Sequence, residues 1–160
     1  MKRILFLCMG NICRSPAAHS VFQHLVDSAK CSERYLIDSA GTIDYHRGSP
    51  PDGRMQDALR KRKIPIIGQS RPLTNEDLKL FDLILAMDKA NFNDARSLDR
   101  DGLGQKKIQL FAEYCSDPHL SEIPDPYYGY GDGFETVLDM IEEGCENLFR
   151  NLENATSEKA

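Results

Sequence analysis

One stretch of the sequence decides the fold: Cys8-Met9-Gly10-Asn11-Ile12-Cys13-Arg14-Ser15, followed directly by Pro16. An apolar run, Ile4-Leu5-Phe6-Leu7, leads into this stretch, and apolar residues at helical spacing follow it up to about Ala29. Proline is favoured at the first position of a helix. The sequence therefore predicts a buried strand, a tight loop and a helix start in close succession, the beginning of a βαβ unit.

The predicted loop has the properties of a site for a tetrahedral oxyanion. Its backbone N–H groups and the positive end of the helix dipole would point at one spot, and Gly10 would let the backbone approach the anion closely. Arg14 can hold two oxygens in a planar fork. Cys8, near a helix N-terminus and a guanidinium, should ionise readily and act as a nucleophile. Ser15 is placed to hydrogen-bond the thiolate or to cap the helix.

The spacing of Cys8, Arg14 and Ser15 resembles the phosphate loop of cysteine-dependent phosphatases. The alternative interpretation is that Cys8 is a buried cysteine at a strand end and Arg14 a surface residue. Gly10, Ser15 and Pro16 all fit the loop, which favours the phosphate-binding interpretation.

Length and composition restrict the class of protein. A chain of 160 residues predicts one domain over residues 1–160. No apolar run approaches the length of a membrane span or a signal peptide, so we expect a cytoplasmic protein without membrane contact. The five cysteines are odd in number and unevenly spaced, which favours a reducing compartment over a disulfide framework. The net charge of −5 argues against general nucleic-acid binding.

The remaining segments predict an α/β fold. The first strand, residues 2–8, is continuously apolar, as in a parallel sheet covered on both faces. Further strands are expected at 35–39, 81–87 and 107–111, with helices between them. A glycine-rich stretch at 129–133 is interpreted as a hinge before a last amphipathic helix, and residues from about 154 to 160 as a frayed tail.

A late loop, Pro124-Asp125-Pro126-Tyr127-Tyr128-Gly129, offers a second chemical group. The prolines fix the backbone around Asp125. A carboxyl group held in this way can donate a proton to a leaving oxyanion and then accept one from an attacking water. Taken alone, Asp125 would be a turn residue before proline. Together with the Cys8 loop, it is a candidate general acid.

The combination resembles the low-molecular-weight protein tyrosine phosphatases. The similarity rests on the Cys8–Pro16 and Asp125–Gly129 segments, in this order, and on the stretches at residues 38–42, 70–74, 81–82 and 87–88. It implies a four-stranded parallel sheet flanked by helices on both faces, flavodoxin-like and of the phosphotyrosine protein phosphatase I type. It also implies hydrolysis of phosphotyrosine through a phosphocysteine, with no metal and no other cofactor.

The resemblance assigns roles residue by residue. It implies Cys8 as nucleophile, Arg14 as phosphate clamp and Asp125 as acid and then base. Cys13 matches a second cysteine that can form a reversible disulfide with Cys8; the alternative interpretation is a small buried loop residue. The other implied roles are phosphate binding by Met9, Gly10, Asn11, Ile12, Cys13, Arg14 and Ser15, loop support by Asn11, Ser15 and Ser39, and aromatic substrate walls at Tyr45, Tyr127 and Tyr128.

One position departs from the family pattern. Many members carry a histidine shortly before the stretch that matches Ser70-Arg71, where this sequence has Gly68-Gln69. The hydrogen bonds that brace Asn11 must therefore be completed differently. Tyr45 also has an ordinary alternative, an exposed loop tyrosine.

Three other functions fit the sequence less well. An arsenate reductase would reuse the loop but needs resolving cysteines close together, and Cys115 and Cys145 are far apart in sequence. A non-catalytic phosphoanion-binding module would not need both Cys8 and Asp125. Zinc binding by Cys8, Cys13 and His19 lacks a usual ligand spacing. The expected partners are a phosphotyrosine protein or an aryl phosphate, with inorganic phosphate as product and inhibitor and the chain as a monomer or weak dimer.

Overall fold

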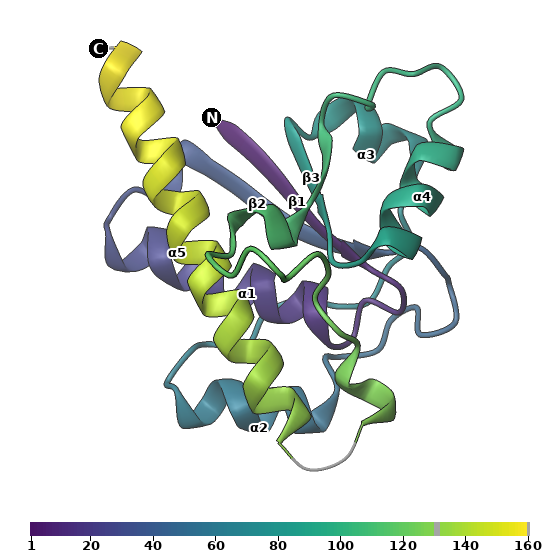
Figure 1. The fold of residues 1–160 in the computed structure, drawn as a ribbon, viewed down its shortest axis with the longest axis vertical. Coiled ribbons are helices and arrows are strands. Elements are labelled where there is room, and N and C mark those ends of the chain that lie inside the picture. Colours follow the sequence, from purple (N-terminus) through teal and green to yellow (C-terminus); the bar gives the residue numbers. More distant parts are fainter. Residues whose placement is uncertain (130–131, 160) are drawn as a thin grey trace.

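The computed structural model describes residues 1–129 and 132–159 and contains one parallel sheet (Figure 1). Its strand order is β2-β1-β3-β4, with every pairing parallel. The strands are β1 (Lys2–Cys8), β2 (Tyr35–Gly41), β3 (Leu83–Ala86) and β4 (Ile108–Leu110). This architecture confirms the predicted fold class.

Helices cover both faces of the sheet. One apolar cluster includes residues of α1, α2 and α5, and a second includes residues of α3 and α4. Figure 1 shows the first three helices on one side of the strands and the other two on the opposite side. The helices are α1 (Arg14–Ser28), α2 (Gly53–Lys61), α3 (Asn75–Leu80), α4 (Lys89–Leu98) and α5 (Gly133–Lys159), with short 3-10 turns η1 (Ser32–Arg34), η2 (Phe111–Tyr114) and η3 (Pro126–Tyr128).

Strand β1 is buried on both sides, as its apolar run predicts. Ile4 and Phe6 belong to the cluster under α1 and α5, whereas Leu5 and Leu7 belong to the cluster under α3 and α4. Successive side chains of a strand point to opposite faces, so one continuous apolar run supplies both halves of the core.

The parallel arrangement gathers three chain segments at one sheet edge. The register places Cys8 opposite Gly41, and Leu7 opposite Ala86. The chain continues from these ends into the loop that precedes α1, the loop after β2 and the N-terminus of α4. The edge formed by the carboxyl ends of the strands is where open α/β sheets bind ligands.

The C-terminal tail is helical in the structure, where the sequence predicted a frayed end. Helix α5 continues to Lys159 and so includes residues 154–159. Glu153 accepts hydrogen bonds from Arg34 and Tyr35 and thereby fastens this end of the helix to the start of β2. Sequence periodicity does not reveal such a polar anchor. Ala160, and Tyr130 and Gly131 of the predicted hinge, lie outside the described residues.

Candidate active site

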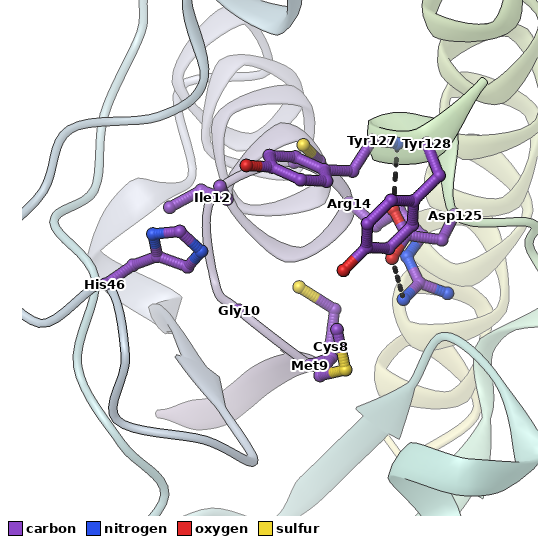
Figure 2. A pocket seen from close by; sticks show the side chains of 10 residues that line it. Cys8, Met9, Gly10, Ile12, Arg14, His46, Asp125, Tyr127 and Tyr128 are labelled. Carbon is purple, nitrogen blue, oxygen red and sulfur yellow. Dashed lines mark hydrogen bonds and ion pairs between the residues drawn. The ribbon is translucent and has the colours of Figure 1, made fainter.

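A pocket opens at the carboxyl edge of the sheet, between the loop after β1 and the loop that carries Asp125 (Figure 2). Most of the residues singled out by the sequence meet here, although they come from opposite ends of the chain. The pocket is lined by Cys8, Met9, Gly10, Ile12, Cys13, Arg14, His46, Asp125, Tyr127 and Tyr128.

Cys8 is the last residue of strand β1, and its side chain contacts a buried hydroxyl group. Its Sγ lies 3.0 Å from the Ser15 hydroxyl oxygen. Asn11 Nδ2 donates to that same oxygen over 2.7 Å, and to the Ser39 hydroxyl over 3.0 Å. Because the Ser15 oxygen already accepts from Asn11, its own proton can point at sulfur and stabilise a thiolate.

The three support residues lie beneath the loop and bind one another. Asn11, Ser15 and Ser39 are each at most 2% exposed. Asn11 adopts a positive φ of 56°, a conformation that asparagine tolerates better than most residues. Its Oδ1 also accepts from the Arg71 backbone N–H over 3.0 Å. The loop is therefore braced before any anion arrives.

Arg14 is fixed by contacts on the side of its guanidinium away from the loop. Nη1 donates to Asp88 Oδ2 over 2.7 Å and to the Ile123 carbonyl over 2.8 Å, and the residue is only 2% exposed. Nε is buried and has no hydrogen-bond partner among the described residues. Since buried donors are normally paired, this N–H is a donor suited to an anion in the pocket.

Asp88, which follows β3, makes two contacts at once. Its Oδ1 accepts from Asn91 N–H at the start of α4, which makes it the N-cap of that helix. Its Oδ2 binds Arg14. Asp88 therefore caps α4 and is also the electrostatic neighbour of Arg14.

Asp125 reaches the pocket from the opposite side. Its Oδ1 accepts from the Tyr127 N–H over 3.0 Å, and its Oδ2 lies 3.5 Å from Arg14 Nη2. The carboxyl group is about one quarter exposed, so it can contact both a bound substrate and water. Tyr127 and Tyr128 follow it on η3, and their rings lie over the mouth of the pocket in Figure 2.

The loop after β2 contributes His46, and not the expected Tyr45, to the lining of the pocket. Tyr45 is 85% exposed and its ring packs on His46, which fits its alternative as an exposed loop tyrosine. The His46 ring lies with Cδ2 3.0 Å from the place where a Cβ on Gly10 would lie. Only a glycine at position 10 allows the His46 ring to pack so closely, a relation that local sequence does not show.

Cys13 shares the pocket with Cys8 and is 3% exposed. Burial, reinforced by the nearby Asp52 carboxylate, raises the pKa of its thiol far above the usual range. Cys13 therefore keeps its proton at neutral pH. In the described part of the chain, no group of three or more His, Cys, Asp or Glu side chains could hold a metal ion, so Cys8, Cys13 and His19 do not form a zinc site.

Comparison with known proteins identifies the family of the chain. Residues 3–158 match the family model for low molecular weight phosphotyrosine protein phosphatase. The human protein of that name is 41% identical over 145 residues, which cover 90% of this chain and 91% of the human one.

Solved structures agree over the whole fold. A protein tyrosine phosphatase from Entamoeba histolytica superposes with a TM-score of 0.91 at 39% identity, covering 98% of this chain and 99% of that one. A Drosophila arginine phosphatase superposes with a TM-score of 0.86 at 32% identity, covering 95% of this chain and 98% of that one. The chain belongs to the low molecular weight phosphotyrosine protein phosphatase family.

Proposed function

We propose that this protein is a protein tyrosine phosphatase that hydrolyses phosphotyrosine and small aryl phosphate monoesters through a phosphocysteine intermediate. One observation carries the proposal: a nucleophile, a cation and a carboxyl group, Cys8, Arg14 and Asp125, line the same pocket. Family membership supports the same activity and does not favour the arsenate reductase alternative.

The first step transfers the phosphoryl group to sulfur. The Cys8 thiolate attacks phosphorus, so that an S–P bond forms as the P–O bond to the aryl group breaks. The Asp125 carboxylic acid donates its proton to the departing phenolate oxygen. Backbone N–H groups of the loop and Arg14 Nε hold the three equatorial oxygens, where negative charge is shared in the transition state.

The second step releases phosphate. Asp125, now a carboxylate, takes a proton from a water that attacks phosphorus, and the S–P bond breaks to regenerate the Cys8 thiolate. The Ser15 hydroxyl, 3.0 Å from Sγ, stabilises the thiolate as a leaving group. Inorganic phosphate occupies the same loop and is therefore both product and inhibitor.

An aryl ester suits this site for two reasons. Phenolate is a fair leaving group because tyrosine ionises near pKa ~10, whereas a serine alkoxide is far more basic. Tyr127 and Tyr128 flank the mouth of the pocket, where they can contact a ring whose phosphate reaches the floor. The net charge of −5 repels anions at a distance, so attraction has to come from the loop and Arg14.

Turnover of p-nitrophenyl phosphate in the presence of a chelator tests the proposal. Cys8→Ser should abolish turnover, and Asp125→Asn should lower kcat by about 10²–10⁴-fold, the usual scale for a general acid. Asp44→Asn is the matched control, because this exposed carboxylate lies outside the pocket. Equal rates in wild type and Cys8→Ser would exclude the thiolate mechanism.

Substrate class is tested with peptides of one sequence that carry phosphotyrosine, phosphoserine or phosphoarginine. Phosphotyrosine should be hydrolysed fastest. Faster hydrolysis of phosphoarginine would assign the protein instead to the activity named for its Drosophila neighbour. Tight binding of phosphotyrosine without any turnover would indicate the non-catalytic binding module.

We also propose Cys13 as the redox partner of Cys8. Peroxide would oxidise the Cys8 thiolate to a sulfenic acid, and the Cys13 sulfur would then displace water, after loss of its proton, to form a disulfide. The placement of both cysteines around one pocket supports this proposal. Peroxide should inactivate the wild type reversibly and Cys13→Ser irreversibly; failure of dithiothreitol to restore the wild type would refute the proposal.

Two features of the chain bear on the compartment in which the protein acts. No described helix has both the length and the apolar content needed to cross a membrane. All five cysteines are unpaired, which supports a reducing compartment and our proposal of a cytoplasmic protein. We propose a single catalytic domain over residues 1–160 that acts as a monomer or weak dimer without nucleic acid.

A further inference from the structure

A buried histidine lies beside the bracing network and is not used by the mechanism above. His19 is on α1, one turn after Ser15, and is only 8% exposed. Its Nδ1 is buried and has no hydrogen-bond partner among the described residues. A buried ring nitrogen without a partner is costly, so its surroundings require an explanation.

The surroundings of Nδ1 converge on Gly68. A Cβ built on Gly68 would lie 3.7 Å from His19 Nδ1, 3.8 Å from Ser39 Oγ and 3.6 Å from Pro16 Cβ. Gly68 has a φ of +111°, which strongly disfavours any residue with a side chain. No side chain of position 68 therefore separates the imidazole from the Ser39 hydroxyl.

The Ser39 hydroxyl has a proton to donate. Its oxygen accepts from Asn11 Nδ2 over 3.0 Å, and no acceptor for its own O–H is found in the described part of the chain. A hydroxyl that accepts one hydrogen bond is best satisfied by donating another. The Ser39 O–H therefore needs an acceptor, and the nearby His19 Nδ1 is an acceptor that needs a donor.

We propose that His19 is a positioning residue of the active site: its neutral imidazole accepts a hydrogen bond at Nδ1 from one water molecule over Gly68, and that water accepts the Ser39 proton. The accepted proton orients Ser39 so that its lone pair faces Asn11. Asn11 then donates to Ser15, and Ser15 to the Cys8 sulfur. Asn11 Nδ2 donates to both hydroxyls, so a fixed Ser39 fixes the orientation of the Asn11 amide and, through it, the position of Ser15 against the Cys8 sulfur.

The environment of His19 keeps the imidazole neutral, as an acceptor must be. Burial, the largest effect, lowers the pKa of His19. The negative charge of Asp38 and a hydrogen bond with the Ile37 backbone raise the pKa, and the positive charge of Arg71 lowers it. Asp38 and Arg71 also bind each other at 3.0 Å, so their charges largely compensate. The imidazole is therefore available as an acceptor near neutral pH.

Three variants separate this role from simple packing. His19→Leu removes the acceptor, whereas His19→Asn keeps an acceptor at the δ position. His24→Leu, on the same helix and only partly buried, is the matched control. The readout is the rate of Cys8 alkylation by iodoacetamide as a function of pH in a Cys13→Ser background, which reports how easily the thiol ionises.

We expect His19→Leu to move the pH midpoint of alkylation upward by about one unit, which corresponds to a tenfold smaller thiolate fraction below the midpoint. His19→Asn should restore at least half of this shift, and His24→Leu should leave the midpoint unchanged. In a Ser39→Ala background His19→Leu should cause no further shift of the midpoint, because the hydrogen-bond connection from His19 to Cys8 is already broken.

An unchanged midpoint in folded His19→Leu, equal shifts in His19→Leu and His19→Asn, or full additivity with Ser39→Ala would each overturn the proposal. The proposal rests on the proposed function only through the importance of the thiolate. If the midpoints shift as expected but the protein hydrolyses no phosphate ester, the proposed function is refuted and the positioning role of His19 is retained. If turnover is normal and the midpoint does not move in His19→Leu, only the positioning role of His19 is refuted.

Discussion

Gly41, the last residue of β2, is the position where one added carbon should most directly disturb the site. A Cβ at this position would lie 2.7 Å from the Met9 carbonyl oxygen and 3.2 Å from the Asn11 nitrogen. Both atoms belong to the backbone of the phosphate loop. Gly41 cannot retreat, because its N–H donates to the Arg71 carbonyl over 2.8 Å and its carbonyl accepts from Leu73 N–H over 2.7 Å.

The expected size of the effect follows from the overlap. A carbon–oxygen contact in proteins is comfortable at about 3.3 Å, so Gly41→Ala requires the loop to move by about 0.6 Å. A displacement of about 1 Å in a catalytic constellation can cost about 100-fold. We therefore expect Gly41→Ala to lower kcat/KM for p-nitrophenyl phosphate by about tenfold.

The control is Gly53→Ala at the first turn of α2, where an added Cβ meets nothing within 4 Å. This change should leave kcat/KM within twofold of the wild type. Steady-state kinetics should be accompanied by circular dichroism to confirm folding. A folded Gly41→Ala protein whose kcat/KM matches that of the Gly53 variant would refute the inference that β2 fixes the loop.

Three further outcomes can be measured. Gly144→Ala should lower the free energy of unfolding by about 1–3 kcal/mol in urea titrations, because its Cβ would lie 2.4 Å from the Phe111 ring; unchanged stability would show that the ring can move. Because burial lowers the pKa of His19 from 6.5, the unfolded state binds the proton more readily, so stability should fall as the pH drops below about 6.5; an equal slope in His19→Leu would contradict this. Asp88→Ala should remove a helix cap worth about 1 kcal/mol and the partner of Arg14, raising KM for p-nitrophenyl phosphate, whereas an unchanged KM and melting temperature would show that neither contact matters.

Local sequence was sufficient for the parts of the site that are contiguous in the chain. The loop could be predicted from the spacing of Cys8, Gly10, Arg14 and Ser15, because its geometry depends on residues within one strand–loop–helix segment. The apolar run of β1 likewise reveals burial on both faces.

The wall of the pocket and the C-terminus depended on partners distant in the sequence. Tyr45 and His46 are equally plausible as neighbours of the loop, and the packing of His46 against Gly10 chooses between them. The end of α5 is polar, yet contacts of Glu153 with β2 hold it in place. A single sequence gives no signal for either choice, because each depends on which surfaces the fold brings together.

The sequence by itself determined the chemistry of this protein, a thiolate, a guanidinium and a carboxylic acid, and the parallel sheet that presents them. Only the tertiary structure decided how these groups are held: Arg14 by Asp88, Asn11 by the Arg71 backbone, and the loop by the close approach of Gly41. The reason is physical. Residue type fixes what a group can do, whereas long-range contacts fix its position to a fraction of an ångström, and catalysis requires both.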